Sequence, residues 1–121
     1  MHSDFTTFGP WKKAMDLALR VHQISKSFPK EEQYGVTSQL RRAALSVAAN
    51  IAEGYGRYTY PDKMHKYVQA RGELIEAMSH LYFCQGVGYL DQTQLNDLTA
   101  NCQEIHRMLN ALIKKMNIED S

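Results

Sequence analysis

The chain has 121 residues, of which 44% are hydrophobic and 22% charged, as in ordinary globular proteins. This length allows a core that depends on neither disulfides nor metals, so we expect a single domain over residues 1–121. Fourteen basic and 13 acidic residues leave a formal charge of +1, which excludes a strong overall attraction for nucleic acid.

The N-terminal half of the chain predicts two helices. Pro10 suits the first turn of a helix, which we expect over residues 10–27. Its apolar residues recur every three or four positions and therefore share one face: Trp11, Ala14, Ala18, Val21 and Ile24. A second helix is expected over residues 37–55, and Gly54 and Gly56 are expected to end it.

The C-terminal half predicts two longer helices, over residues 61–86 and 92–116. Thr59 is expected to cap the first of them, and Asp91 with Gln94 forms a capping-box pair before the second. The helix over residues 61–86 is expected to bury one apolar stripe: Met64, Tyr67, Val68, Leu74, Ile75, Met78, Leu81 and Tyr82. The helix over residues 92–116 carries a heptad repeat: Leu95, Leu98, Cys102, Ile105, Leu109, Leu112 and Met116.

Four helices with short connections favour an all-α fold, an antiparallel up-down-up-down four-helix bundle. Residues 1–9 and 118–121 are expected to be loose ends. In such a bundle Cys84 and Cys102 would lie roughly 15 Å apart, beyond disulfide reach, so both are interpreted as reduced core cysteines. No run approaches the ~20 apolar residues of a membrane helix, so we expect a cytoplasmic protein without membrane contact.

An alanine-rich stretch, QLRRAALSVAANIAEGYGR, covers residues 39–57, where small side chains let a neighbouring helix come close. Three polar residues are candidates for helix packing or a subunit boundary: Asn50, Glu53 and Arg71. Glu53 is expected to pair with Arg42 or Arg71, because an arginine inside an apolar stripe needs a partner. Direct ligand contact is the alternative for Asn50 and Glu53.

The titratable residues show no catalytic or metal-binding pattern. Glu76 and His80 lie four residues apart, which indicates a contact within one helix. His22, His65 and His106 have no metal-ligand spacing, and no Glu-x-x-His pair of a di-iron bundle occurs. Both cysteines occupy core-like positions, where a raised pKa makes a thiol inert. We therefore expect a non-enzyme without catalytic residues, metal or cofactor.

Basic residues around the connection after residue 55 give the best argument for nucleic-acid binding. The candidates are Arg41, Arg42, Arg57, Lys63 and Lys66, with Tyr55, Tyr58 and Tyr60 between them. Basic side chains neutralise phosphates, while tyrosines offer stacking surfaces to unpaired bases. The same tyrosines, with Trp11 and Tyr67, suit a subunit interface equally well. The sequence leaves both uses open.

The stretch over residues 39–57 resembles the signature of the four-helix-bundle proteins encoded by intervening sequences in bacterial 23S ribosomal RNA genes. The resemblance extends to Trp11, Phe28-Pro29, the GELIE stretch at Gly72–Glu76, and Gly88-Tyr89-Leu90. In this family proline is common where Ala48 stands, so an expected kink is absent or milder here. The resemblance implies a homo-oligomer, a ring of five subunits, and no established catalysis. A related fold is the accessory protein of diversity-generating retroelements, which binds reverse transcriptase and nucleic acid.

Two hypotheses follow, ahead of a third, an enzyme of unrecognised type, which the residues disfavour. The first is a non-enzymatic, self-associating helical scaffold, a homopentamer, that binds RNA or a nucleic-acid-handling protein. The second is a purely structural or protein-interaction module with no nucleic-acid role. Binding to RNA over a salt series separates them, because phosphate contacts weaken steeply with salt.

Overall fold

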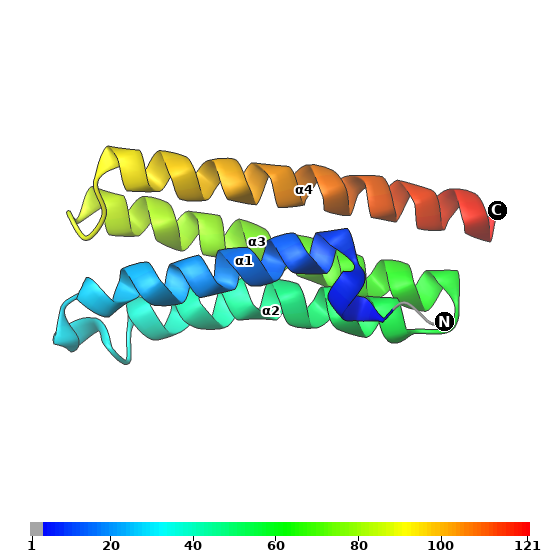
Figure 1. Cartoon of the computed structure of the whole chain (residues 1–121), viewed down its shortest axis with the longest axis horizontal. Coiled ribbons are helices and arrows are strands. Elements are labelled where there is room, and N and C mark those ends of the chain that lie inside the picture. Colours follow the sequence, from blue (N-terminus) through cyan, green and yellow to red (C-terminus); the bar gives the residue numbers. More distant parts are fainter. Residues whose placement is uncertain (1–3) are drawn as a thin grey trace.

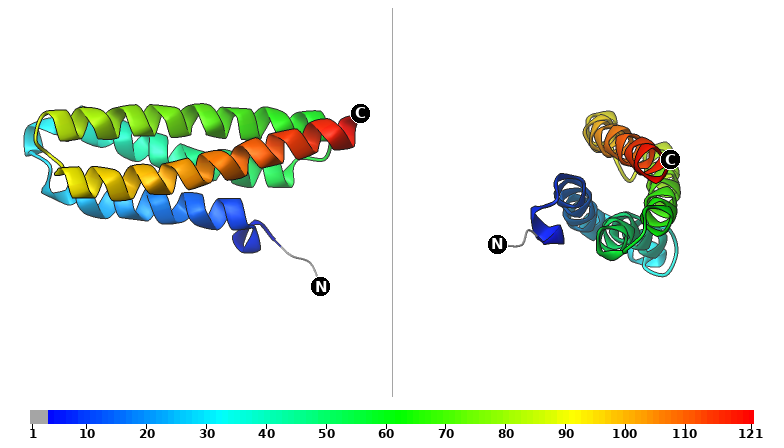
Figure 2. Two further views of the ribbon diagram at one scale, coloured as in Figure 1. Left: turned by 90° about the horizontal axis from the view of Figure 1, so that it is seen from above. Right: turned by 90° about the vertical axis from the view of Figure 1, so that its right-hand side faces the viewer.

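The computed structural model describes residues 4–121, and this part of the chain contains four long helices and no strand. The helices are α1 (Gly9–Ile24), α2 (Val36–Gly56), α3 (Tyr60–Gly86) and α4 (Gln92–Asp120), as Figure 1 shows. Successive helices run in opposite directions along a common axis in the left view of Figure 2. The predicted all-α, up-down-up-down four-helix bundle is therefore confirmed.

The segment before α1 is ordered by local packing. Phe5–Thr7 forms a 3-10 helix, and the ring of Phe5 meets Trp11 edge-on with the ring centroids 5.1 Å apart. The expectation of a loose end is thus wrong for residues 5–9, because these aromatic rings hold the segment against the bundle. Residues 1–3 lie outside the described range. At its other end α1 passes into a 3-10 turn, Ser25–Ser27, which completes the helix expected to residue 27.

Capping groups define the starts of α3 and α4. The Thr59 hydroxyl accepts a hydrogen bond from the backbone N–H of Asp62 at 3.2 Å. Asp91 and Gln94 exchange side-chain to backbone hydrogen bonds at 2.7 and 2.9 Å, which completes the predicted capping box. Helix α4 continues to Asp120, past its expected end at residue 116, because no glycine or proline follows to stop it.

The α1–α2 and α3–α4 connections lie at the same end of the bundle and contact each other. Gly88, with φ of 87°, ends α3 in a Schellman motif, in which the backbone N–H of Tyr89 donates to the carbonyl of Cys84 at 2.8 Å. The Tyr89 hydroxyl then donates to Glu32 at 2.8 Å, and its ring packs on Phe28. The α3–α4 turn is thereby attached to the α1–α2 connection.

The core lies between the four helices, and α2 packs most extensively on α3. Ala43, Ala44 and Ala48 are completely buried, which explains the alanine-rich sequence: small side chains bring α2 close to its neighbours. Helix α2 is continuous through Ala48. Gly54 lies inside α2 instead of ending it. A glycine is needed at this position because a Cβ there would come within 2.6 Å of the Tyr67 ring. The helix ends at Gly56.

Helix α3 carries apolar residues on two faces. Its inner face is buried and consists of Tyr67, Ala70, Leu74, Ala77, Leu81 and Cys84. Val68, Ile75 and Tyr82, predicted on the same buried stripe, are instead 41, 50 and 54% exposed. They lie seven residues apart and so share a face, but that face points away from the core. The prediction of one buried stripe was therefore wrong for these three residues.

Candidate functional site

The five basic residues predicted to contact nucleic acid do not form one patch. Arg41 and Arg42 lie in the first third of α2, whereas Arg57, Lys63 and Lys66 lie around the connection from α2 to α3. Arg57 follows Arg41 by sixteen positions, which is about 24 Å along the axis of α2. The structure therefore divides the candidates into two groups at different levels of the bundle.

Arg41 and Arg42 both have partners within the chain. The Arg41 Nε atom donates to the hydroxyl of Ser25 at 2.7 Å, which joins α2 to the end of α1. The Arg42 Nη2 atom contacts the Glu76 carboxylate at 2.6 Å, and its Nη1 atom lies 3.6 Å from the Glu73 carboxylate. Arg42 thus links α2 to α3, and phosphate binding would compete with both carboxylates.

Lys63 satisfies carbonyl groups at the end of α2. Its Nζ atom donates to the backbone oxygen of Tyr55 at 2.8 Å and to that of Gly54 at 3.3 Å. The last carbonyls of a helix lack partners within the helix, so a lysine there completes their hydrogen bonding. Partial burial lowers the pKa of Lys63. These contacts give Lys63 a structural role.

Glu53 does not pair with Arg42 or Arg71, so the predicted partner was wrong. Its carboxylate lies 2.8 Å from the Lys66 Nζ atom and 3.7 Å from the Arg57 guanidinium. The hydrogen bond and the charge of Lys66 lower the pKa of Glu53, with a smaller effect from Arg57. Because α3 presents Lys66 at the level of Glu53, this pair bridges α2 and α3 at the bundle surface.

Arg71 and Asn50 face different neighbours. Arg71 donates to the side-chain oxygen of Asn110 on α4 at 2.9 Å. Asn50 donates to the carbonyl of Ser46 in its own helix at 2.9 Å. Of the three polar positions singled out by sequence, Glu53 and Arg71 therefore connect helices, whereas the hydrogen bond of Asn50 stays within α2.

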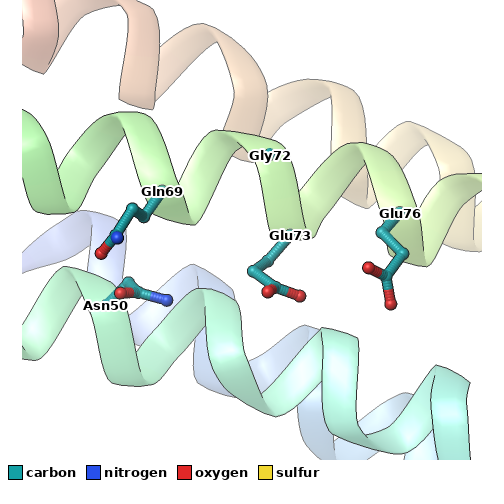
Figure 3. Close-up of a pocket in the computed structure, with 5 residues that line it drawn as sticks. All are labelled: Asn50, Gln69, Gly72, Glu73 and Glu76. Atoms are coloured by element: carbon teal, nitrogen blue, oxygen red, sulfur yellow. The ribbon is translucent and has the colours of Figure 1, made fainter.

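A groove of about 330 Å³ runs between α2 and α3, and Figure 3 shows its lining: Asn50, Gln69, Gly72, Glu73 and Glu76. One oxygen of Glu73 is buried there without a hydrogen bond from the described residues. The His80 Nε2 atom lies 3.4 Å from Glu76, which confirms the predicted contact within α3. These carboxylates and amides are suited to accepting and donating hydrogen bonds.

The aromatic candidates divide into packed and exposed residues. Tyr67 is buried. The ring of Tyr55 packs on that of Phe8, with the two ring centroids 5.0 Å apart. Tyr58, in the connection before α3, is 96% exposed, and Tyr60, the first residue of α3, is 40% exposed. Within the predicted aromatic set, these two residues are the most available for stacking on a base.

The cysteines are free and buried, as predicted. Burial raises the pKa of Cys84 to about 11 and that of Cys102 to about 12, so both thiols stay protonated at neutral pH. Across residues 4–121, no group of three or more His, Cys, Asp or Glu side chains is arranged to hold a metal ion. No helix in the same range is both apolar and long enough to cross a bilayer.

A further candidate surface was missed by the sequence analysis. We call it the outer face of α3, and it consists of Val68, Gly72, Ile75, Ser79, Tyr82 and Gly86, all exposed. Phe83 and Val87 extend it and are 50 and 47% exposed. The signals in the sequence were the spacing of 4, 3, 4, 3 and 4 residues and a glycine in the middle of a long helix. Exposed apolar patches of this kind mark interaction sites.

Fold and surfaces together define an all-α four-helix-bundle protein with an uncovered apolar helix face. The chain matches the family model described as 23S rRNA-intervening sequence protein over residues 7–111. It belongs to this family, and the resemblance of its alanine-rich stretch is thereby confirmed.

One solved structure with the same fold is a protein of unknown function from the S23 ribosomal protein family of Bacteroides thetaiotaomicron VPI-5482. The TM-score is 0.78 at 21% sequence identity, over 87% of this chain and 98% of that chain. At this identity the likeness supports the fold alone. A comparison with curated proteins gives no match.

Proposed function

We propose that the protein is a non-enzymatic, cytoplasmic helical scaffold that self-associates, as a ring of five subunits, and binds RNA or a nucleic-acid-handling protein. The outer face of α3 is the observation that carries this proposal. Val68, Ile75 and Tyr82 remain about half exposed in a single subunit, and covering such side chains stabilises an assembly. The number five comes from the family resemblance.

Nucleic-acid binding is supported by the family description and by residues at the start of α3. Tyr58 and Tyr60 expose their rings, and Arg57 lies beside them with its side chain 47% exposed. The contact from Arg57 to Glu53 is long, at 3.7 Å, and such exposed ion pairs are weak. A ring would repeat this small site in every subunit, so weak single contacts would add up to avid binding.

A purely structural or protein-interaction module is the alternative, and the basic residues favour it. Arg41, Arg42, Lys63 and Lys66 all contact oxygen atoms of the chain itself. A phosphate would have to displace these partners, whereas a protein could cover the outer face of α3 without disturbing them.

RNA binding measured by fluorescence anisotropy over a salt series tests the first part of the proposal. Binding should weaken steeply as salt rises, and a variant with Arg57→Ala and Tyr58→Ala should bind more than about tenfold more weakly. Lys26→Ala is the matched control, because this exposed lysine lies after α1 at the opposite end of the bundle from the α2–α3 connection, and it should change binding little. No binding at about 100 µM protein in low salt would contradict an RNA role and leave the alternative.

Native mass spectrometry and sedimentation test self-association independently of RNA. We expect assemblies at tens of micromolar protein, and Ile75→Lys should dissociate them by placing a charge in the outer face of α3. Gln103→Lys, at an exposed position of α4, is the matched control. A protein that stays monomeric under these conditions would contradict the scaffold proposal.

A further inference from the structure

We propose that a pocket at the end of the bundle where α4 ends binds one unpaired nucleotide of an RNA strand, with the base among tyrosine rings and the phosphate beside Lys115. This inference rests on the nucleic-acid part of the proposed function. It goes beyond that part by naming the pocket, the chemical unit that the pocket takes and the residues that contact it.

The pocket has a volume of about 350 Å³ and lies between the end of α2, the start of α3 and the last turns of α4, at the right-hand end of Figure 1. Four aromatic residues line it: Phe8, Tyr55, Tyr60 and Tyr67. Pockets that bind small ligands measure about 300–1,000 Å³ and combine apolar or aromatic walls with a few polar groups. This pocket is near the lower limit, so its size suits a single nucleotide unit.

Tyr67 supplies a polar group to the wall of the pocket. This residue is only 2% exposed, and among residues 4–121 its hydroxyl has no hydrogen-bond partner. Buried tyrosine hydroxyls usually have a partner, because an unsatisfied buried polar group is costly. Burial, with a smaller effect from Tyr55, raises the pKa of Tyr67 to about 12, so the hydroxyl stays protonated at neutral pH and can donate to a ligand. A nucleobase offers suitable acceptors in its ring nitrogens and carbonyl oxygens.

The charges in the wall of the pocket favour a bound anion. Lys63 and Lys115 line it together with one carboxylate, that of Glu119. Lys63 keeps its two backbone carbonyl partners and contributes its charge alone. Lys115 is exposed, and within residues 4–121 no hydrogen bond or ion pair engages its ammonium group. A phosphate can therefore bind Lys115 without displacing a partner.

The groove between α2 and α3 has nearly the same volume, about 330 Å³, but the opposite charge. Of the described residues, two carboxylates line it, Glu73 and Glu76, and no basic side chain does. These carboxylates repel an anion. The pocket beside Lys115 is therefore the better site for a phosphate.

Tyr60 joins the pocket to the exposed residues of the α2–α3 connection. It lines the pocket, and the exposed Arg57 and Tyr58 come shortly before it in the chain. Single-stranded nucleic acid binds by stacking successive bases on aromatic side chains while basic groups follow its backbone. A strand that contacts Arg57 and Tyr58 can therefore place a neighbouring base in the pocket, which favours a nucleotide within a strand over a free one.

Titrations with a mononucleotide and with RNA test the inference. Adenosine 5′-monophosphate and ribose 5-phosphate are titrated into the protein and followed by NMR, and binding of a single-stranded RNA of about eight nucleotides is followed by fluorescence anisotropy. The mononucleotide should bind with a dissociation constant of about 1 mM, and the sugar phosphate at least about tenfold more weakly, because it has no base to stack. Equal affinities would mean that the pocket takes a phosphate alone and would overturn the inference.

Two adjacent lysines of α4 provide a matched pair of variants. Lys115→Glu should weaken the binding of the mononucleotide and of the RNA more than about tenfold, because it replaces the phosphate contact with a repulsive charge. Lys114→Glu makes the same change in charge at an exposed neighbour that does not line the pocket, and it should change binding less than about threefold. Equal effects of the two variants would indicate general attraction to a basic surface and would overturn the inference.

Tyr67→Phe tests the hydroxyl in the wall of the pocket. The change removes no hydrogen bond within residues 4–121, so the melting temperature should not fall, whereas the mononucleotide should bind about fivefold more weakly. Tyr89→Phe is the control, because it removes the bond to Glu32 at the other end of the bundle. It should lower the melting temperature and leave binding unchanged. Unchanged mononucleotide binding in Tyr67→Phe would contradict the assigned contact.

The outcomes separate this inference from the proposed function. RNA binding that Lys115→Glu weakens and Lys114→Glu does not supports both. RNA binding that neither Lys115→Glu nor Tyr67→Phe changes overturns the pocket and leaves the RNA role standing. Binding of the mononucleotide without binding of RNA means that the ligand is a free nucleotide, which overturns this inference and the RNA role. Absence of binding by both ligands contradicts both as well.

Discussion

Helix α3 has an inner and an outer face with the same heptad spacing, and only the inner face is buried. The inner residues step by 3, 4, 3, 4 and 3 positions from Tyr67 to Cys84, and the outer residues by 4, 3, 4, 3 and 4 from Val68 to Gly86. Periodicity therefore identifies residues that share a face. Which face meets the core depends on where α2 and α4 lie.

Two glycines inside helices show the same difference between a buried and an exposed position. Gly54 is buried, and the ring of Tyr67 occupies the space where its Cβ would be. Gly72 is exposed and has open space at the equivalent position. The first glycine is explained by the fold of one subunit, whereas no contact within the subunit explains the second.

The largest expected difference between the two faces is in the free energy of unfolding. Leu74→Ala on the inner face should lower it by about 2–5 kcal/mol, because a completely buried side chain is lost and a cavity remains. Ile75→Ala on the outer face should lower it by less than about 1 kcal/mol in dilute protein. Urea unfolding followed by circular dichroism measures both values, and equal losses would contradict the assignment of the two faces.

Alkaline pH should lower the free energy of unfolding through three titratable residues buried in the core. Burial raises the pKa of Cys84 to about 11 and those of Tyr67 and Cys102 to about 12. The folded protein holds these protons more tightly than the unfolded chain, so their contribution is complete below pH 9 and is lost as the pH rises towards 12. We expect the free energy of unfolding to fall by several kcal/mol between pH 8 and 11, with most of the loss coming from the two thiols.

The cysteine contribution to this pH dependence can be isolated with one variant. Cys102→Ala should be less stable than the parent at pH 8, because the side chain is completely buried. It should nevertheless lose less stability between pH 8 and 11, since one titrating group has been removed. Urea titrations at both pH values measure the two slopes, and identical slopes would contradict the assigned cause.

Gly54→Ala should destabilise the folded chain despite the higher helix propensity of alanine. The new Cβ would lie 2.6 Å from the Tyr67 ring, so the ring or the helix must shift. Overpacking of this kind costs about 1–3 kcal/mol. Thermal unfolding should show a lower melting temperature, and an unchanged value would mean that Tyr67 moves without cost.

The smallest expected effect is the opposite one at Gly72. Gly72→Ala should raise the free energy of unfolding by about 0.5–1 kcal/mol in dilute protein, because alanine favours the helix and meets no neighbour. Gly54→Ala is the same substitution, also inside a helix, so the sign of the change in the free energy of unfolding distinguishes the two positions. A loss of stability at Gly72 in the monomer would contradict the open position that the structure shows.

Much of the fold followed from local signals. The capping groups at Thr59 and Asp91 were predictable because helix starts leave backbone N–H groups that only a few side chains satisfy. The heptad repeat of α4 was also predictable, since its apolar residues all lie on one stripe. The partners of Glu53 and Arg42 were not, because each depends on the level at which α2 and α3 pass one another.

The sequence by itself determined four helices, their order and direction, and the family to which the chain belongs, since these depend on local propensity and on spacing along the chain. Only the tertiary structure decided that the basic residues are divided and internally paired, and that α3 leaves an apolar face uncovered. Ion pairs and burial are set by distances between helices, and those distances arise only when the helices pack.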